Sequence, residues 1–163
     1  MMAAKRRCMS DRNDAGRNGA PPPVVFRRSF PARPDAVRLT LISFGERMLP
    51  HAGADLTGRS ELVLAELLNN IALHGHAGDP GPEPLIDLCV AARPDGLCCS
   101  ISDDGALLPE SCLSPRLPEP AGHPEGGFGW FLIDHLTRSL GYSRENGRNH
   151  LAFMVPANAP EPH

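Results

Sequence analysis

Residues 60–76 read SELVLAELLNNIALHGH, and this stretch decides the fold because it is the most strongly periodic segment of the chain. At 100° per residue, its large apolar side chains fall on one continuous face of a helix. These side chains are Val63, Leu64, Leu67, Leu68 and Ile71. Thr57 or Ser60 is expected to cap the helix at its N-terminus. The stretch therefore predicts an amphipathic helix that packs on a core.

A stripe of polar side chains borders the apolar face of this helix. Glu66, Asn70 and His74 are spaced four residues apart, so each is rotated only about 40° from the one before. A carboxylate, an amide and an imidazole beside a core require a polar cavity or a ligand to satisfy them. A lone Glu/Asn pair is more often ordinary helix surface, so the stripe indicates a site only together with other signals.

The residues before this helix predict a strand and a shorter helix. Residues 24–30 are rich in Val and Phe and read as a strand that Pro31 and Pro34 end. Residues 35–49 space their apolar side chains for one buried helical face, and Pro50 is expected to stop that helix.

The residues after it predict a hairpin, a third helix and a second hairpin. Two strand-like runs are joined by Pro94-Asp95-Gly96 in the manner of a hairpin. The runs are 84–93 and 97–103, and the later elements are a helix over 128–140 and strands over 141–146 and 150–156. The order predicts an α+β two-layer sandwich, with a mixed, mostly antiparallel sheet covered on one face by about three helices.

Two further segments carry residue types that suit a ligand. The strand 97–102 leads directly into Asp103-Asp104-Gly105, which puts a carboxylate at a strand end where glycine permits a close approach. On its own this sequence is a common turn. Gly126-Gly127-Phe128-Gly129 opens a predicted helix, where free N–H groups and the helix dipole favour phosphate oxygens.

Composition narrows the class of protein. A chain of 163 residues holds one domain, and a formal net charge of -3 gives no positive field for nucleic acid. Five cysteines without a C-x-x-C pair suit reduced thiols, and neither a signal peptide nor a membrane span is recognisable. We therefore expect a cytoplasmic protein with no direct nucleic-acid or membrane partner.

Proline and glycine divide the chain into regions. Residues 1–23 are expected to form a disordered tail, residues 24–157 the folded domain and residues 158–163 a flexible C-terminus. Residues 106–126 contain several prolines and no periodicity. Because such long structureless loops are uncommon in compact domains, this one is predicted to be a lid, a binding loop or disordered.

In this order, E-x-x-x-N-x-x-x-H, a strand ending in D-D-G and a helix opening with G-G-x-G form a set more specific than any member. The chain resembles the ATPases of the gyrase, histidine-kinase and mismatch-repair superfamily. The segments ELLNNIALHGHAG, ISDDG and GGFGWFLIDHLTRSLGYSRENGRNHLAFMV resemble the anti-sigma-factor serine kinases in particular. The resemblance covers roughly residues 25–156.

The resemblance implies a role for each part of the set. Glu66 would be the general base, Asn70 would hold Mg²⁺, and the stripe as a whole, with His74, would face the cofactor ATP. Asp103 would accept a hydrogen bond from the adenine amino group, with Gly105 beneath the base. Gly127 and Gly129 would wrap the phosphates, and residues 106–126 would be the ATP lid. Two departures stand out: Leu107 occupies a place where many relatives have glycine, and the lid contains no lysine.

Three functions remain open on this one fold. The first is a protein serine/threonine kinase that phosphorylates a STAS-type anti-sigma-factor antagonist and sequesters a sigma factor; relatives of this kind are homodimers. The second is a non-catalytic switch in which ATP shapes a protein-binding surface. The third is a detached histidine-kinase catalytic domain, against which the absence of a helical hairpin with a phospho-acceptor histidine argues. Retention of Glu66 and Asn70 favours the kinase.

Overall fold

The computed structural model describes residues 20–74, 81–108 and 128–160. Of the predicted tail 1–23 it therefore includes residues 20–23 alone, and of the predicted lid 106–126 residues 106–108 alone. Gly127 and residues 161–163 of the predicted C-terminus also lie outside the described residues.

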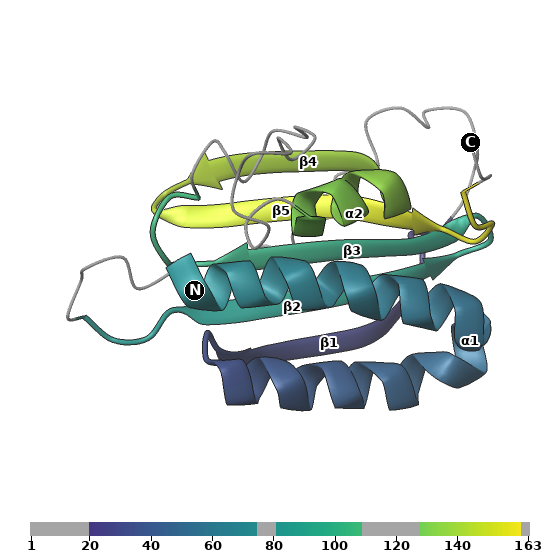
Figure 1. Cartoon of the computed structure of the whole chain (residues 1–163), viewed down its shortest axis with the longest axis horizontal. Helices are drawn as coiled ribbons and strands as arrows, with labels where there is room; N and C mark the ends of the chain where they lie inside the picture. Colours follow the sequence, from purple (N-terminus) through teal and green to yellow (C-terminus); the bar gives the residue numbers. More distant parts are fainter. Residues whose placement is uncertain (1–19, 75–80, 109–127, 161–163) are drawn as a thin grey trace.

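One five-stranded sheet and three helical segments form the described fold. The sheet order is β1-β2-β3-β5-β4, and Figure 1 shows the helices together on one face of it. The elements are β1 (Val24–Pro31), α1 (Pro34–His74), β2 (Leu85–Arg93), β3 (Gly96–Asp103), α2 (Phe128–Leu136), β4 (Arg138–Glu145) and β5 (Arg148–Pro156). The predicted two-layer α+β architecture is confirmed.

Every pairing between the described strands is antiparallel, so the sheet is not mixed as predicted. The reason lies in α1, whose two halves run side by side in opposite directions (Figure 1). The chain leaves the end of β1, travels out along one half and returns along the other. Leu85 at the start of β2 therefore pairs with Pro31 at the end of β1.

The reversal within α1 occurs at Gly53 and not at Pro50, where the sequence predicted the first helix to stop. Gly53 has a φ of 74° and a ψ of 169°, a conformation that glycine adopts without steric cost. The predicted caps Thr57 and Ser60 are also wrong, because both lie inside the second half of α1. The Ser60 hydroxyl donates to the carbonyl oxygen of Leu56 at 2.8 Å, which is the interior-helix pattern for serine.

The third helix is shorter than predicted. α2 ends at Leu136, where the Thr137 amide and hydroxyl both donate to the Ile133 carbonyl oxygen at 3.0 and 2.6 Å. Arg138 already belongs to β4, which pairs with β5 through an irregularity near Ser139, a residue with a φ of 57°. Cross-strand pairing thus overrides the helical pattern of residues 138–140.

The core lies between the helices and the sheet. Its largest fully buried side chains come from both halves of α1, from α2 and from the inner faces of β2, β3 and β5. They include Phe44, Met48, Leu64, Leu67, Leu68, Ile71, Ile86, Leu88, Ile101, Ile133 and Leu151. The apolar face predicted from residues 60–76 is therefore the centre of the domain. Within the described residues, no helix is both long and apolar enough to cross a membrane.

Candidate functional site

The polar stripe lies on the second half of α1, beside the buried apolar face. Glu66, Asn70 and His74 are all half-buried, whereas Asn69, next to the stripe, is exposed. Helical backbone continues through all three positions, so the predicted spacing holds. A carboxylate, an amide and an imidazole thus follow one line along the edge of the core.

Glu66 reaches across to α2. A Cβ atom at position 129 would overlap the Glu66 Oε2 atom and lie 3.1 Å from its Cδ atom. Gly129 is in the first turn of α2, where backbone N–H groups give the helix a partly positive end that favours a carboxylate. The structure therefore brings together two predicted site residues that are 63 positions apart. The other predicted glycine, Gly127, lies outside the described residues.

Asp103 ends β3 and is almost fully buried, with 2% of its surface exposed. Its Oδ1 atom accepts two hydrogen bonds, one from the Gly105 amide at 2.9 Å and one from Asn149 Nδ2 at 3.0 Å. Asp104 turns the other way and accepts from the Leu85 amide at 2.8 Å. Within the described residues, no hydrogen bond to the second oxygen of Asp103 is present.

Burial raises the pKa of the Asp103 carboxyl above its ordinary value of 3.8, because the ionised form loses its hydration. The hydrogen bonds from Asn149 and Gly105 act in the opposite direction, as does the more distant charge of Arg144, while the Asp104 carboxylate adds to the increase. A buried carboxylate whose pKa is raised and whose second oxygen is open is a typical feature of a functional site.

Three residues of the β4–β5 hairpin extend the hydrogen-bond network around Asp103, and none of them was predicted from the sequence. They are Tyr142, Arg144 and Asn149. Asn149 in β5 is 1% exposed, and its Oδ1 atom accepts from Tyr142 Oη at 2.6 Å and from Arg144 Nη1 at 2.8 Å. A signal was available in the sequence. Asn149 has the same strand parity as Leu151 and Phe153, so it is a polar residue at a core position.

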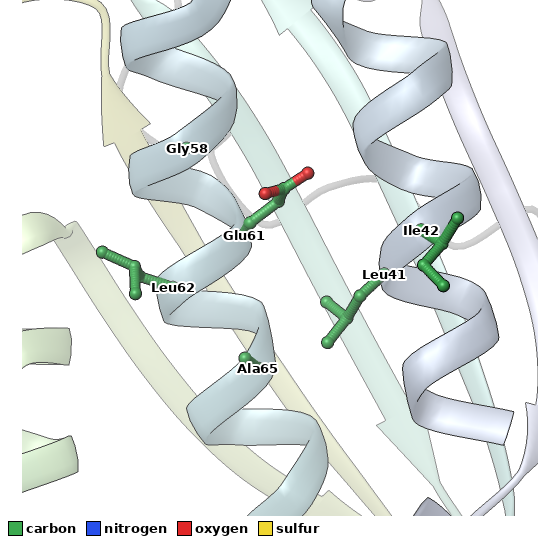
Figure 2. Close-up of a pocket in the computed structure, with 6 residues that line it drawn as sticks. All are labelled: Leu41, Ile42, Gly58, Glu61, Leu62 and Ala65. Carbon is green, nitrogen blue, oxygen red and sulfur yellow. The ribbon is translucent and has the colours of Figure 1, made fainter. Parts of the chain in front are cut away.

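A separate groove lies between the two halves of α1, as Figure 2 shows. Its volume is about 440 Å³. Leu41 and Ile42 line one side, and the other side consists of Gly58, Glu61, Leu62 and Ala65. None of the predicted site residues belongs to it. The apolar groove is therefore separate from the polar stripe of α1 and from Asp103.

The metal-binding side chains of the described residues do not cluster. Among the described residues, no group of three or more His, Cys, Asp or Glu side chains converges in a way that could hold a metal ion. A cation at the stripe would thus depend on one or two protein oxygens, such as the Asn70 amide, together with ligand oxygens and water.

Residues 30–155 match the sequence profile of the histidine kinase-like ATPase domain. The fold is similar to the catalytic domain of the histidine kinase ThkA in a nucleotide-free form, with 15% sequence identity and a TM-score of 0.46. That alignment covers 81% of this chain and 98% of the other. No curated protein matches the chain.

Proposed function

The chain belongs to the histidine kinase-like ATPase domain family, and from this premise we propose that it is an ATP-dependent protein serine kinase of the anti-sigma-factor type. It would phosphorylate a STAS-type antagonist and sequester a sigma factor in the cytoplasm. The observation that carries ATP binding is the buried Asp103 carboxylate, which has one oxygen saturated by two donors and the other open. The identity of the protein partners rests on the resemblance in sequence alone.

Asp103 suits the adenine base. An ionised carboxylate is purely an acceptor, and the exocyclic amino group of adenine is a donor that its open oxygen can receive. Gly105 follows two residues later, is buried and donates its amide to the same carboxylate. The absence of a side chain at this position would permit the close approach of a flat base to the strand end.

Asn70 suits a magnesium ion that arrives with the nucleotide. Mg²⁺ prefers oxygen ligands, keeps several waters and is commonly held by one or two protein oxygens plus phosphates. The Asn70 amide oxygen fits that pattern. When bound, the ion would neutralise phosphate charge. Asn70 would hold it on the helix edge, four residues from Glu66.

Glu66 suits the role of general base. Its carboxylate would take the proton of an incoming serine hydroxyl as the serine oxygen forms a bond to the γ-phosphorus of ATP and the bond to the β-phosphate oxygen breaks. ADP then leaves, and the partner carries the phosphate. His74 follows Asn70 by four residues on the stripe and would face the same nucleotide.

Calorimetric titration of the full chain with ATP, with and without Mg²⁺, tests the nucleotide site. We expect Mg²⁺-dependent binding that Asn70→Ala weakens and Asn69→Ala leaves unchanged, because Asn69 is the exposed neighbour on the same helix. Absence of binding at millimolar ATP would refute the nucleotide function.

Transfer is tested separately, by incubating the protein with γ-labelled ATP and a STAS-type antagonist. Label on a serine of the antagonist would support the kinase. Nucleotide binding with unlabelled antagonist would instead support the non-catalytic switch, in which ATP only shapes a protein-binding surface.

A further inference from the structure

We propose that Asn149 is a positioning residue for Asp103, and that the β4–β5 hairpin thereby sets the preference of the site for a purine with a 6-amino group. The proposal rests on the nucleotide binding proposed above and adds three residues, Tyr142, Arg144 and Asn149, to which the sequence assigned no role.

All the hydrogen-bonding capacity of the Asn149 amide is used. Its Nδ2 atom donates to Asp103 Oδ1 at 3.0 Å and to the Ala106 carbonyl oxygen at 2.9 Å. Its Oδ1 atom accepts from Tyr142 Oη and Arg144 Nη1. An amide offers two donors and two lone pairs, so four partners satisfy it completely. With 1% of its surface exposed, Asn149 has no need of water.

The partners also fix which way the amide points. If its oxygen and nitrogen were exchanged, the oxygen would face the Asp103 carboxylate and the Ala106 carbonyl, and the nitrogen would face the Arg144 guanidinium. Both contacts would be repulsive, since an acceptor would meet acceptors and a donor a donor. Tyr142 and Arg144 therefore hold a donor against Asp103.

This donor and the Gly105 amide meet the same oxygen of Asp103, so the carboxylate is held in one orientation and its other oxygen keeps its capacity to accept. Arg144 Nη1 also donates to the Gly105 carbonyl oxygen at 3.0 Å, which ties down the turn that would lie beneath the base. An acceptor fixed in that place favours adenine, whose 6-position donates, over guanine, whose 6-position accepts. Asn149 would act on the base only through Asp103.

Burial is the largest influence on the pKa of Asp103 and raises it, and the contact with Asn149 opposes this effect. Asn149 stabilises the ionised carboxylate and lowers its pKa, against the opposing effects of burial and Asp104. Arg144 contributes in the same direction as Asn149, and the Tyr142 phenol donates to Asn149 Oδ1. Loss of the Asn149 donor should thus extend the neutral form of Asp103 to higher pH, where it no longer offers a pure acceptor.

Two ligands that differ by one amino group test the proposal. ATP and purine riboside 5′-triphosphate, which lacks the 6-amino group, are titrated into the wild type and Asn149→Leu by calorimetry. We expect the substitution to weaken ATP binding roughly tenfold or more, the effect of one hydrogen bond to a charged group. Binding of the purine analogue should stay within about twofold of wild type. Equal losses for both ligands, or no loss for ATP, would overturn the proposal.

Two further variants keep the test decisive if Asn149→Leu fails to fold. Tyr142→Phe removes one of the groups that orient Asn149 and should reproduce the selective loss of ATP affinity at smaller size. Ser143 is on the opposite face of the same strand, so Ser143→Ala should leave the affinity for both ligands unchanged. The acid limb of ATP binding should move to higher pH in Asn149→Leu, a shift that a general loss of packing would not produce. A wild type that binds ATP and the analogue equally would refute this inference alone; a wild type that binds neither would refute the nucleotide function as well.

Discussion

The carboxylate of Glu66 lies against Gly129, at the place where every other amino acid carries its Cβ atom. The contact joins the polar stripe of α1 to the first turn of α2, directly after the loop expected to cover the nucleotide. A side chain proposed as the base is therefore held by packing against an element whose start is proposed to bind phosphate. The absence of a side chain at Gly129 therefore makes room for the Glu66 carboxylate, in addition to its proposed role near phosphate.

Gly129→Ala should displace the Glu66 carboxylate and slow phosphotransfer. The new methyl group would overlap Oε2 and lie 3.1 Å from Cδ, so the flexible end of Glu66 must move while the backbone stays in place. A misplacement of about 1 Å at a reacting group costs on the order of 10²-fold in rate. We expect that loss in single-turnover assays, with thermal unfolding little changed. Gly141→Ala is the matched control, because position 141 has open space for a methyl group; a normal rate in Gly129→Ala would contradict the role of the contact.

Glu66→Gln should abolish transfer while preserving ATP binding. The amide keeps the size and packing of the carboxylate but takes up no proton, and loss of a general base typically lowers the rate about 10²- to 10⁴-fold. The comparison is with Glu61→Gln. Glu61 lines the groove of Figure 2, is on the same helix as Glu66 and also lies against a glycine, Gly45. Rates from a quenched-flow assay and affinities from calorimetry separate the two effects. Equal rates in Glu66→Gln and the wild type would remove Glu66 from the mechanism.

Asp103→Asn should weaken ATP binding without weakening the fold near neutral pH. The variant keeps an acceptor for Gly105 and Asn149 but can place a donor where the open oxygen was, opposite the amino group of adenine. The affinity measured by calorimetry should therefore fall. An unchanged affinity would exclude Asp103 from the adenine site.

The stability of this variant should depend on pH in a defined direction. Since burial raises the pKa of Asp103 above 3.8, the folded wild type holds its proton more tightly than the unfolded chain. Its free energy of unfolding then decreases as the pH rises from about 3.8 through the folded-state pKa, and the decrease is absent below that window. Asparagine does not titrate. Urea unfolding should show Asp103→Asn at least as stable as the wild type above the window, with the advantage shrinking at lower pH; the reverse trend would contradict the raised pKa.

The sequence was informative where local periodicity and packing agree. The apolar face of residues 60–76 predicted the central helix, and apolar strand-like runs predicted the strands now seen as β2, β3 and β5. Predictions failed where distant contacts decide. Residues 138–140 continue a helical pattern but belong to β4, because β4 pairs with β5. The reversal at Gly53 depends on packing one half of α1 beside the other.

The same division holds for the site. The four-residue spacing of Glu66, Asn70 and His74 and the strand-end position of Asp103 were readable, and their roles stay predictions. The support for Asp103 was not readable, because Asn149 is 46 residues away in the chain and reaches it only after β3 and β5 pair. A polar residue at a core position of a strand signals such a network but does not identify its partner.

Arg59→Met should destabilise the domain by detaching the end of β5 from α1. Arg59 is 9% exposed, and its guanidinium donates to the carbonyl oxygens of Pro156 at 2.7 Å and Ala157 at 2.9 Å. Methionine keeps the aliphatic stem but leaves these carbonyls without their charged donor, at a cost of about 1.5–3 kcal/mol in the free energy of unfolding. Asp55 also pairs with Arg59, at 2.8 Å, yet its side chain is 71% exposed, so Asp55→Ala should cost less than about 1 kcal/mol. Urea unfolding of both variants separates the contribution of the hydrogen bonds to Pro156 and Ala157 from that of the ion pair with Asp55. Equal losses would mean that the ion pair, and not the contact with the end of β5, is what Arg59 supplies to stability.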